Sequence, residues 1–276
     1  MESFKESGLL FELMEWKEEY KSVIAGMTMR EGGTSEAPYH SLNMGFHVND
    51  NPETVRTNRT IVSAELNIPA DCWTGSEQVH QAHIHKVSAK DAGFGSMDYE
   101  SAIKMTDGLY TAEQDVFLTS LYADCVPLYF YNHRKKLAGL AHAGWKGTAL
   151  DIGGQMVKRW ADDEGAEVQD IMAAIGPSIG PCCYEVDDYV MSRMTEVLGN
   201  KANRAAAPAG EGKYMLDLKE ANRQLLISSG IREENITVSN FCTSCRNDLF
   251  FSYRKDGGVT GRMMSYIMLK GDSPDS

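Results

Sequence analysis

Short apolar runs rich in β-branched and aromatic residues recur along the chain and are typical of β-strands. We predict strands at residues 23–29, 116–122, 127–131, 136–142, 170–175, 236–240 and 262–269. Apolar residues at helical spacing predict helices at 52–66, 147–162, 185–198 and 216–229, the last with Gly230 as its C-cap. Strands and helices mix without regular β–α–β alternation. The sequence therefore predicts an α+β fold, with one large mixed sheet or two packed sheets flanked by helices.

The stretch 199–213 joins two better-patterned segments and is rich in Ala and Gly, so we predict a surface loop there. A chain of 276 residues is long enough for one large domain or two. No internal repeat or long linker marks a boundary between domains.

The charge of the chain limits its partners. With 27 basic and 39 acidic residues, the net charge is −12, which disfavours binding to nucleic acid. No apolar run reaches the roughly 20 residues of a membrane helix, and the N-terminus lacks the apolar core of a signal peptide. We expect a cytoplasmic protein with no nucleic-acid or membrane partner. A small anionic ligand would need a local basic pocket.

Three separate polar motifs each offer one soft metal ligand. They are SEQVH at His80, YADCVP at Cys125 and AHAGWKG at His142. Two imidazoles and one thiolate suit zinc with an open fourth position, which is typical of catalytic rather than structural sites. A second interpretation pairs Cys125 with His142 as a metal-free nucleophile and base.

The segment QVHQAHIHKV also contains His83 and His85, a His-x-His pair that suggests copper. A four-copper oxidase needs about ten histidines and several such pairs, and this chain has seven histidines. On a strand, His83 and His85 would share one face and His80 the other. We therefore choose His80 as the ligand and expect His83 and His85 to be exposed.

The remaining cysteines carry a weaker signal. Cys242 and Cys245 form one Cys-x-x-Cys, whereas a zinc ribbon needs two, and Cys182 and Cys183 are adjacent. We interpret these four, and Cys72, as buried or incidental thiols rather than disulfides.

A further set of polar residues is assigned to the reaction and to the substrate. Asp124, next to Cys125, is the candidate acid or base. The turn after His142 leads from a strand into a helix and could hold an anion. The candidate substrate-binding residues are Asn43, Arg59, Lys146 and Arg254.

Six motifs occur in an order that resembles a known family, the YlmD/YfiH family. Together they span roughly residues 38–270, and they are HSLNMGFHVNDNPETVRTNR, SEQVH, YADCVPLYFY, LAGLAHAGWKGT, IGPSIGPCCYEV and FCTSCRNDLFFSYR. The family was first known as multicopper polyphenol oxidases or laccase-domain proteins, and its members are now regarded as zinc-dependent purine nucleoside phosphorylases.

The resemblance implies a zinc ion held by His80, Cys125 and His142. It also implies phosphorolysis of adenosine, inosine and methylthioadenosine, with adenosine deaminase as a side activity. The implied fold is similar to the catalytic domain of cytotoxic necrotising factor, in a single domain over residues 1–276. Peptidoglycan-precursor editing, a metal-free Cys–His hydrolase and a copper polyphenol oxidase are the alternatives, and copper is an alternative or adventitious metal. The motifs leave the oligomeric state open.

Overall fold

The computed structural model describes residues 2–271. Its first sheet has six strands in the order β1-β2-β3-β15-β7-β4, and it is antiparallel except for the β4–β7 pair. In chain order these strands are β1 (Phe4–Ser7), β2 (Leu10–Leu13), β3 (Val23–Thr28), β4 (Trp73–Thr74), β7 (Phe117–Tyr122) and β15 (Met263–Leu269).

A second six-stranded sheet has the order β14-β10-β8-β9-β6-β5, with parallel pairs at each edge. Its strands are β5 (Ile84–Lys86), β6 (Gly108–Thr111), β8 (Val126–Asn132), β9 (Leu137–Ala143), β10 (Met172–Ile175) and β14 (Ile236–Val238). A small antiparallel sheet contains β11 (Glu185–Asp187), β13 (Lys213–Leu216) and β12 (Ala206–Gly210).

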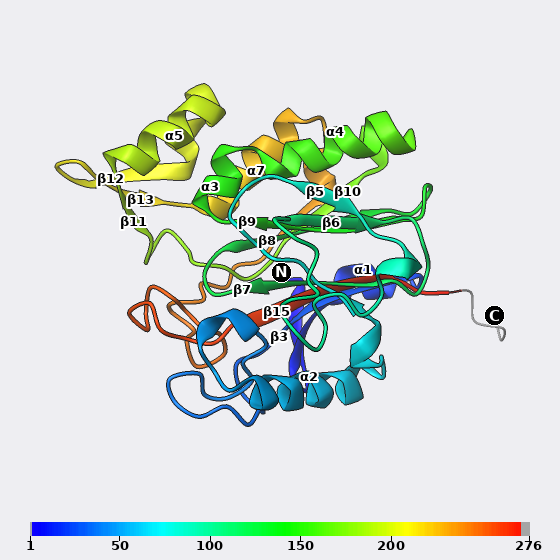
Figure 1. Ribbon diagram of the computed structural model, residues 1–276. Coiled ribbons are helices and arrows are strands. Elements are labelled where there is room, and N and C mark those ends of the chain that lie inside the picture. The colour runs from blue at the N-terminus through cyan, green and yellow to red at the C-terminus, as the bar shows by residue number, and fades with distance from the viewer. Residues whose placement is uncertain (1, 272–276) are drawn as a thin grey trace.

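Helices cover the outer faces of the two large sheets, which are stacked on each other (Figure 1). The helices are α1 (Met14–Glu19), α2 (Pro52–Leu66), α3 (Trp145–Ala149), α4 (Ile152–Glu164), α5 (Asp188–Leu198), α6 (Ala202–Ala205) and α7 (Leu218–Ser228). Helices α3, α4 and α7 lie above the second sheet, and α2 lies below the first. Within residues 2–271, no helix has both the length and the apolar character needed to cross a membrane.

The period of two along β8 shows how the layers are held together. Leu128 and Phe130 pack in one buried cluster with apolar residues of α4 and α7. Tyr129 and Tyr131 point to the other face, into a cluster shared with the first sheet. Strand β8 is therefore apolar or aromatic from Val126 to Tyr131, because both of its faces are buried.

Side-chain caps fix where the long helices begin. The carboxylate or amide oxygen accepts a hydrogen bond from the backbone N–H two or three residues further on in α2, α4, α5 and α7. These N-cap residues are Asn51, Asp151, Asp187 and Asp217.

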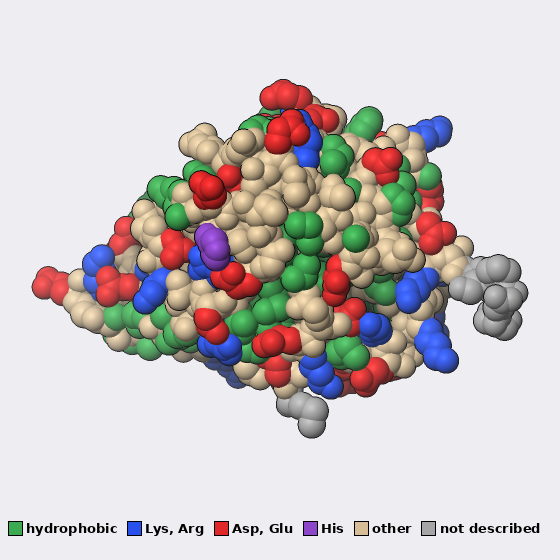
Figure 2. Space-filling model, turned by 90° about the horizontal axis from the view of Figure 1, so that it is seen from below, with side chains coloured by type: hydrophobic (Ala, Val, Ile, Leu, Met, Phe, Trp, Pro, Cys, Tyr) green, Lys and Arg blue, Asp and Glu red, His purple; other side chains and the backbone are tan. Residues whose placement is uncertain are grey.

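On the face of the molecule that α2 covers, acidic and basic side chains are interspersed, so this face does not carry charge of a single sign (Figure 2).

The predicted α+β class is confirmed, with mixed and antiparallel sheets flanked by helices. All seven predicted strands form, with ends shifted by at most two residues, and the helix predicted at 52–66 has those bounds. Gly230 follows α7 with φ of +100°, as expected after a helix end. The similarity to the toxin domain stays a prediction.

Three predictions of local structure are wrong. The helix predicted at 147–162 is divided into α3 and α4, because Asp151 adopts φ of +52° and caps α4. Residues 185–187 of the predicted helix 185–198 form β11, and α5 begins after Asp187. The predicted loop 199–213 instead contains α6 and β12 and leads into β13, because its backbone groups pair across the β12–β13 hairpin.

Candidate active site and metal centre

His80, Cys125 and His142 come together at one end of the second sheet. One ligand atom from each side chain lies within 4.8 Å of the others. His142 is on β9 and pairs with Pro127 of β8, so Cys125, directly before β8, lies near the end of the same pair. His80 comes from the loop between β4 and β5, where it adopts φ of +60°. This loop, rather than a strand end, brings the second imidazole to the thiol.

The spacing of the three side chains fits zinc. Tetrahedral zinc has bonds of about 2.0–2.3 Å, which place its ligand atoms roughly 3.5 Å apart. Small side-chain adjustments would bring the sulfur and the two imidazoles onto one ion. The three residues also line a cavity, so a fourth coordination position would face open space. The donor set and its position therefore suit a metal site that stays open to a ligand.

A buried carboxylate that the sequence analysis missed organises this cluster. Asp107 Oδ1 lies 2.9 Å from Nδ1 of His142. The same carboxylate accepts hydrogen bonds from the backbone N–H groups of Val79, His80 and Gln81, at 3.1, 3.0 and 2.9 Å. The contact to Nδ1 leaves Nε2 of His142 available as the ligand atom. Asp107 stands alone before β6, in a context with no spacing pattern that could have revealed it.

Gly144 leaves room for the cluster. A Cβ atom at this position would lie 2.9 Å from the Cys125 sulfur and 3.3 Å from Cδ2 of His80. The first distance is shorter than a side chain tolerates, so any larger residue would displace the thiol. The glycine of the HAGW motif is thus explained by close approach of side chains.

Cys125 and His142 form a charged pair. Burial raises the pKa of the Cys125 thiol, but the charge and hydrogen bonds of His142 and His80 outweigh it and lower that pKa to about 6. Burial lowers the pKa of His142, whereas the Cys125 thiolate and Asp107 raise it to about 9. Cys125 is therefore a thiolate near neutral pH, the form that binds metals and attacks electrophiles.

The cavity has a volume of about 560 Å³, which is within the usual range for small-molecule sites. Two predicted substrate residues, Lys146 and Arg254, line it together with Asp124. Among the other lining residues that the sequence analysis missed are His47, Gln78, Tyr184 and Arg262. Burial and the nearby Arg262 lower the pKa of His47 to about 4, so its imidazole is neutral. No spacing pattern marks these four residues, because each comes from a different segment.

Two other predicted substrate residues lie outside the cavity lining. Arg59 is buried and donates hydrogen bonds to the backbone carbonyls of Met44, Gly95 and Ser96. Asn43 is also buried, and its Oδ1 accepts from the backbone N–H of Arg262 at 2.9 Å. Both side chains therefore hold backbone segments in place, because their polar atoms already form hydrogen bonds with backbone groups.

Asp124 has partners at both carboxylate oxygens. Thr243 Oγ1 donates to Oδ1 at 2.6 Å, and the backbone N–H of Arg254 donates to Oδ2 at 2.7 Å. Asp124 also has φ of +83° and connects the end of β7 to two segments near the C-terminus.

His83 is exposed and His85 half-buried, and neither belongs to a potential ligand group within residues 2–271.

Four of the remaining thiols form a group that the sequence analysis did not predict. Cys182, Cys183, Cys242 and Cys245 lie together, with all sulfurs within 4.8 Å of one another, and the group could hold a metal ion. Three of these thiols are exposed or half-buried rather than buried. The adjacent pair occupies a turn, where two neighbouring side chains can point to the same side, unlike on a regular strand or helix.

Comparisons with known proteins identify the family. The family model described as multi-copper polyphenol oxidoreductase laccase matches residues 24–270. A relative from Bacillus subtilis, named purine nucleoside phosphorylase YlmD, is 47% identical over 91% of this chain and 90% of its own length. The chain therefore belongs to the YlmD/YfiH family of laccase-domain proteins.

Solved structures agree with this assignment. The crystal structure of YlmD from Geobacillus stearothermophilus has a TM-score of 0.95 and 42% identity, covering 98% of this chain and all of that one. A hypothetical protein YfiH from Bacillus licheniformis has a TM-score of 0.93 and 46% identity, covering 97% of this chain and 99% of that one. The fold of the whole described chain is thus the fold of this family.

Replacing Asp107 by Asn tests its positioning role. We expect Asp107→Asn to weaken zinc binding about 10- to 100-fold, because the amide removes the charge that supports His142 and one acceptor for the His80 loop. Competition with a chromophoric chelator measures the affinity. Asp98→Asn, a change at an exposed carboxylate outside the cluster, is the control. Equal zinc affinity in the two variants would contradict the role of Asp107.

Alkylation tests the charged pair in chelator-treated protein. Since the folded-state pKa of Cys125 is lowered to about 6, its alkylation rate should rise through about pH 6 and level off near neutrality. Cys72, whose pKa is raised by partial burial and by Asp71, should react only at higher pH. Peptide mass mapping with iodoacetamide gives both rates. Added zinc should protect Cys125 and leave Cys72 unchanged; equal rates at Cys125 with and without zinc would argue against coordination.

Proposed function

We propose that this protein is a zinc-dependent purine nucleoside phosphorylase. It cleaves adenosine, inosine and methylthioadenosine with inorganic phosphate, giving the free base and ribose 1-phosphate or its methylthio analogue. The observation that carries the proposal is the convergence of His80, Cys125 and His142 on the wall of a cavity large enough for a nucleoside. The name of the Bacillus subtilis relative, purine nucleoside phosphorylase, supplies the reaction.

In this proposal the two imidazoles and the thiolate hold zinc, and Asp107 fixes His142 and the His80 loop. When bound by these residues, zinc would supply a Lewis acid at the wall of the cavity. The bond between the anomeric carbon and the purine nitrogen breaks as a phosphate oxygen bonds to that carbon. The purine leaves with the electron pair and takes up a proton. The sugar becomes positively charged in the transition state, and negative charge near the sugar stabilises that state.

Three cations in the cavity provide the local basic pocket that an anionic co-substrate needs in an acidic chain. They are Lys146, Arg254 and Arg262. Arg254 uses guanidinium N–H groups on the carbonyls of Cys183 and Glu185, and Arg262 uses Nη1 on those of Thr260 and Gly261. Lys146 is exposed, so its ammonium group is the most readily available of the three for phosphate.

Aromatic side chains in this cavity offer flat surfaces on which a purine can stack. Trp145, Tyr184 and Tyr253 line it, and flat rings of this kind stack on nucleobases. Asp124 was the candidate acid from sequence. Because both of its oxygens already accept hydrogen bonds, we assign it to holding the segment of Arg254 rather than to proton transfer.

Further details belong to the same proposal. The protein has a weaker adenosine deaminase activity, in which water attacks C6 of the adenine base and ammonia leaves, giving inosine. Its whole chain acts as one catalytic domain, and it works in the cytoplasm on small molecules. Copper is an adventitious metal. A metal-free Cys125–His142 hydrolase is the second candidate, favoured by the low pKa of Cys125, and retained activity after exhaustive chelation would support it.

Phosphate dependence tests the reaction itself. Adenosine should yield adenine and the ribose 1-phosphate only when phosphate is present, as measured by liquid chromatography. Cys125→Ala should lose at least about 100-fold in kcat/KM, because zinc loses its only thiolate at this site. Cys72→Ala, an exposed cysteine outside both clusters, should keep wild-type activity. Full activity in metal-free Cys125→Ala protein would falsify the proposal.

Lys146→Gln tests the phosphate contact. We expect KM for phosphate to rise about tenfold with little change in kcat, since the lost charge–charge hydrogen bond contributes about 1.4 kcal/mol to binding. KM for adenosine should stay the same. Lys158→Gln, an exposed lysine of α4 that is not part of the cavity lining, is the control. A rise in KM for adenosine instead would assign Lys146 to the nucleoside.

A further inference from the structure

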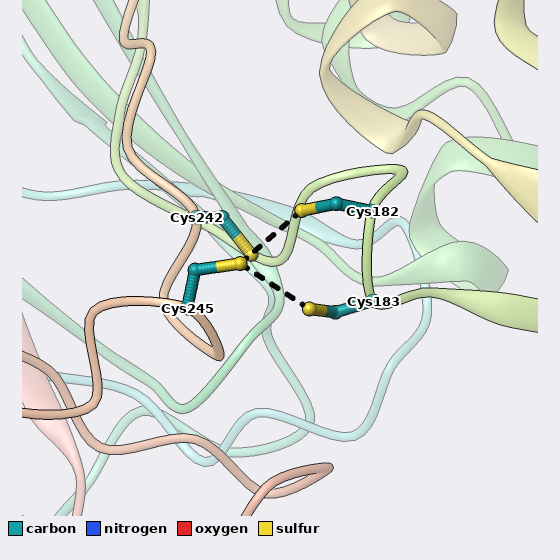
Figure 3. Close-up of side chains that lie close together, drawn as sticks. All are labelled: Cys182, Cys183, Cys242 and Cys245. Atoms are coloured by element: carbon teal, nitrogen blue, oxygen red, sulfur yellow. Dashed lines mark hydrogen bonds between the residues drawn. The ribbon is translucent and has the colours of Figure 1, made fainter.

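Four cysteines from two segments that are distant in the chain lie together in one group (Figure 3). Cys182 and Cys183 lie in the turn between β10 and β11, and Cys242 and Cys245 lie between β14 and β15. The Cys245 sulfur is 3.4 Å from the sulfurs of both Cys182 and Cys183. Figure 3 shows all four side chains pointing into the space between the two segments.

We propose that these four thiolates bind one zinc ion in a closed structural site, separate from His80, Cys125 and His142. A zinc–sulfur bond is about 2.3 Å long, so sulfurs on a tetrahedral ion lie roughly 3.8 Å apart. The four sulfurs, all within 4.8 Å of one another, fit this spacing. An open position is not needed here, because four protein ligands complete the coordination of zinc.

The backbone holds the two segments in register around the sulfurs. Ser178 and Cys242 form an isolated parallel bridge, and the N–H of Thr243 donates to the carbonyl of Ser178 at 3.1 Å. The N–H of Gly180 donates to the Cys242 sulfur at 3.2 Å. Hydrogen bonds from N–H groups to metal-bound thiolates are the usual support of such ligands. The protein therefore offers a prepared set of ligands.

The mutual closeness of the sulfurs favours one ion over other occupants. A disulfide brings only two sulfurs together and leaves the other two without a reason to converge. An iron–sulfur cluster places several metal atoms between its cysteines and needs them farther apart. Zinc is the common ion with four thiolate ligands.

Positive side chains offset the charge of such a site. Zinc with four thiolates carries a net charge of about −2. Buried Lys219 donates to the carbonyls of Ser239 and Phe241, the latter directly before Cys242. Arg254 donates to the carbonyl of Cys183. Each cysteine-bearing segment thus has a cation bonded to its backbone.

The position of the site gives it a role in shaping the cavity wall. Tyr184, next to Cys183, lines the cavity, as does Ile179. Thr243, between the ligands Cys242 and Cys245, donates to Asp124. Zinc at the four cysteines would hold these residues in place and stabilise the wall without contacting substrate.

Zinc counting tests the proposal. Zinc-loaded protein, kept under a phosphine reductant and freed of loosely bound metal, should hold about two zinc ions per chain by atomic emission. His80→Ala should hold one, at the four cysteines, and the double variant Cys182→Ser, Cys245→Ser should also hold one. Cys72→Ser should hold both. The zinc content of the His80→Ala protein is measured without any assay of phosphorylase activity. Failure of this proposal and failure of the phosphorylase proposal therefore give different results.

Measuring thiol reactivity gives a second test that does not require the cysteine variants to fold. In zinc-loaded His80→Ala protein, a disulfide reagent should modify Cys72 and Cys125 quickly and the four clustered cysteines at least about tenfold more slowly, until a mercurial releases the zinc. Overturning outcomes are no tightly held zinc in His80→Ala protein, rapid reaction of all six thiols, or disulfides among the four under reductant.

Discussion

The buried carboxylate of Asp107 holds together two segments on which the rest of the site depends. One oxygen contacts the imidazole of His142 on β9, and the carboxylate accepts the backbone N–H groups of residues 79–81. Without this carboxylate, the backbone N–H groups of residues 79–81 would lose their hydrogen-bond partner. An unpaired N–H group destabilises the fold where water is excluded. The spacing between His80 and His142 therefore follows from a residue that is not among those lining the cavity.

A second carboxylate, that of Asp124 directly before Cys125 in the chain, acts in a similar way. It connects the end of β7 to Thr243 and to the backbone of Arg254, and its own carbonyl accepts the N–H of Ile179. These partners belong to the segments that carry the clustered cysteines and part of the cavity wall. Asp107 and Asp124 are thus two buried carboxylates, each of which fixes a different wall of the cavity.

The predictions that succeeded depended on local signals. Periodicity gave the α+β class and the main strands, because burial of both faces makes a strand such as β8 almost entirely apolar or aromatic. His80, Cys125 and His142 could be proposed as ligands because few residue types bind zinc, and the structure brings these three side chains together. Arg59 and Asn43 looked equally suited to a substrate, but they satisfy buried carbonyls and amides instead. A polar side chain carries no mark in sequence that distinguishes these two uses.

By itself, the sequence determined the fold class, the family and the identity of three candidate ligands, since these depend on composition, periodicity and motif. The tertiary structure decided which residues meet. It brought Asp107 to His142 and Cys182 to Cys245, pairs that are 35 and 63 residues apart in the chain. It also joined two adjacent cysteines to a Cys-x-x-Cys in one group of four. Such contacts are set by strand register and loop packing, which act between distant segments and leave no local pattern.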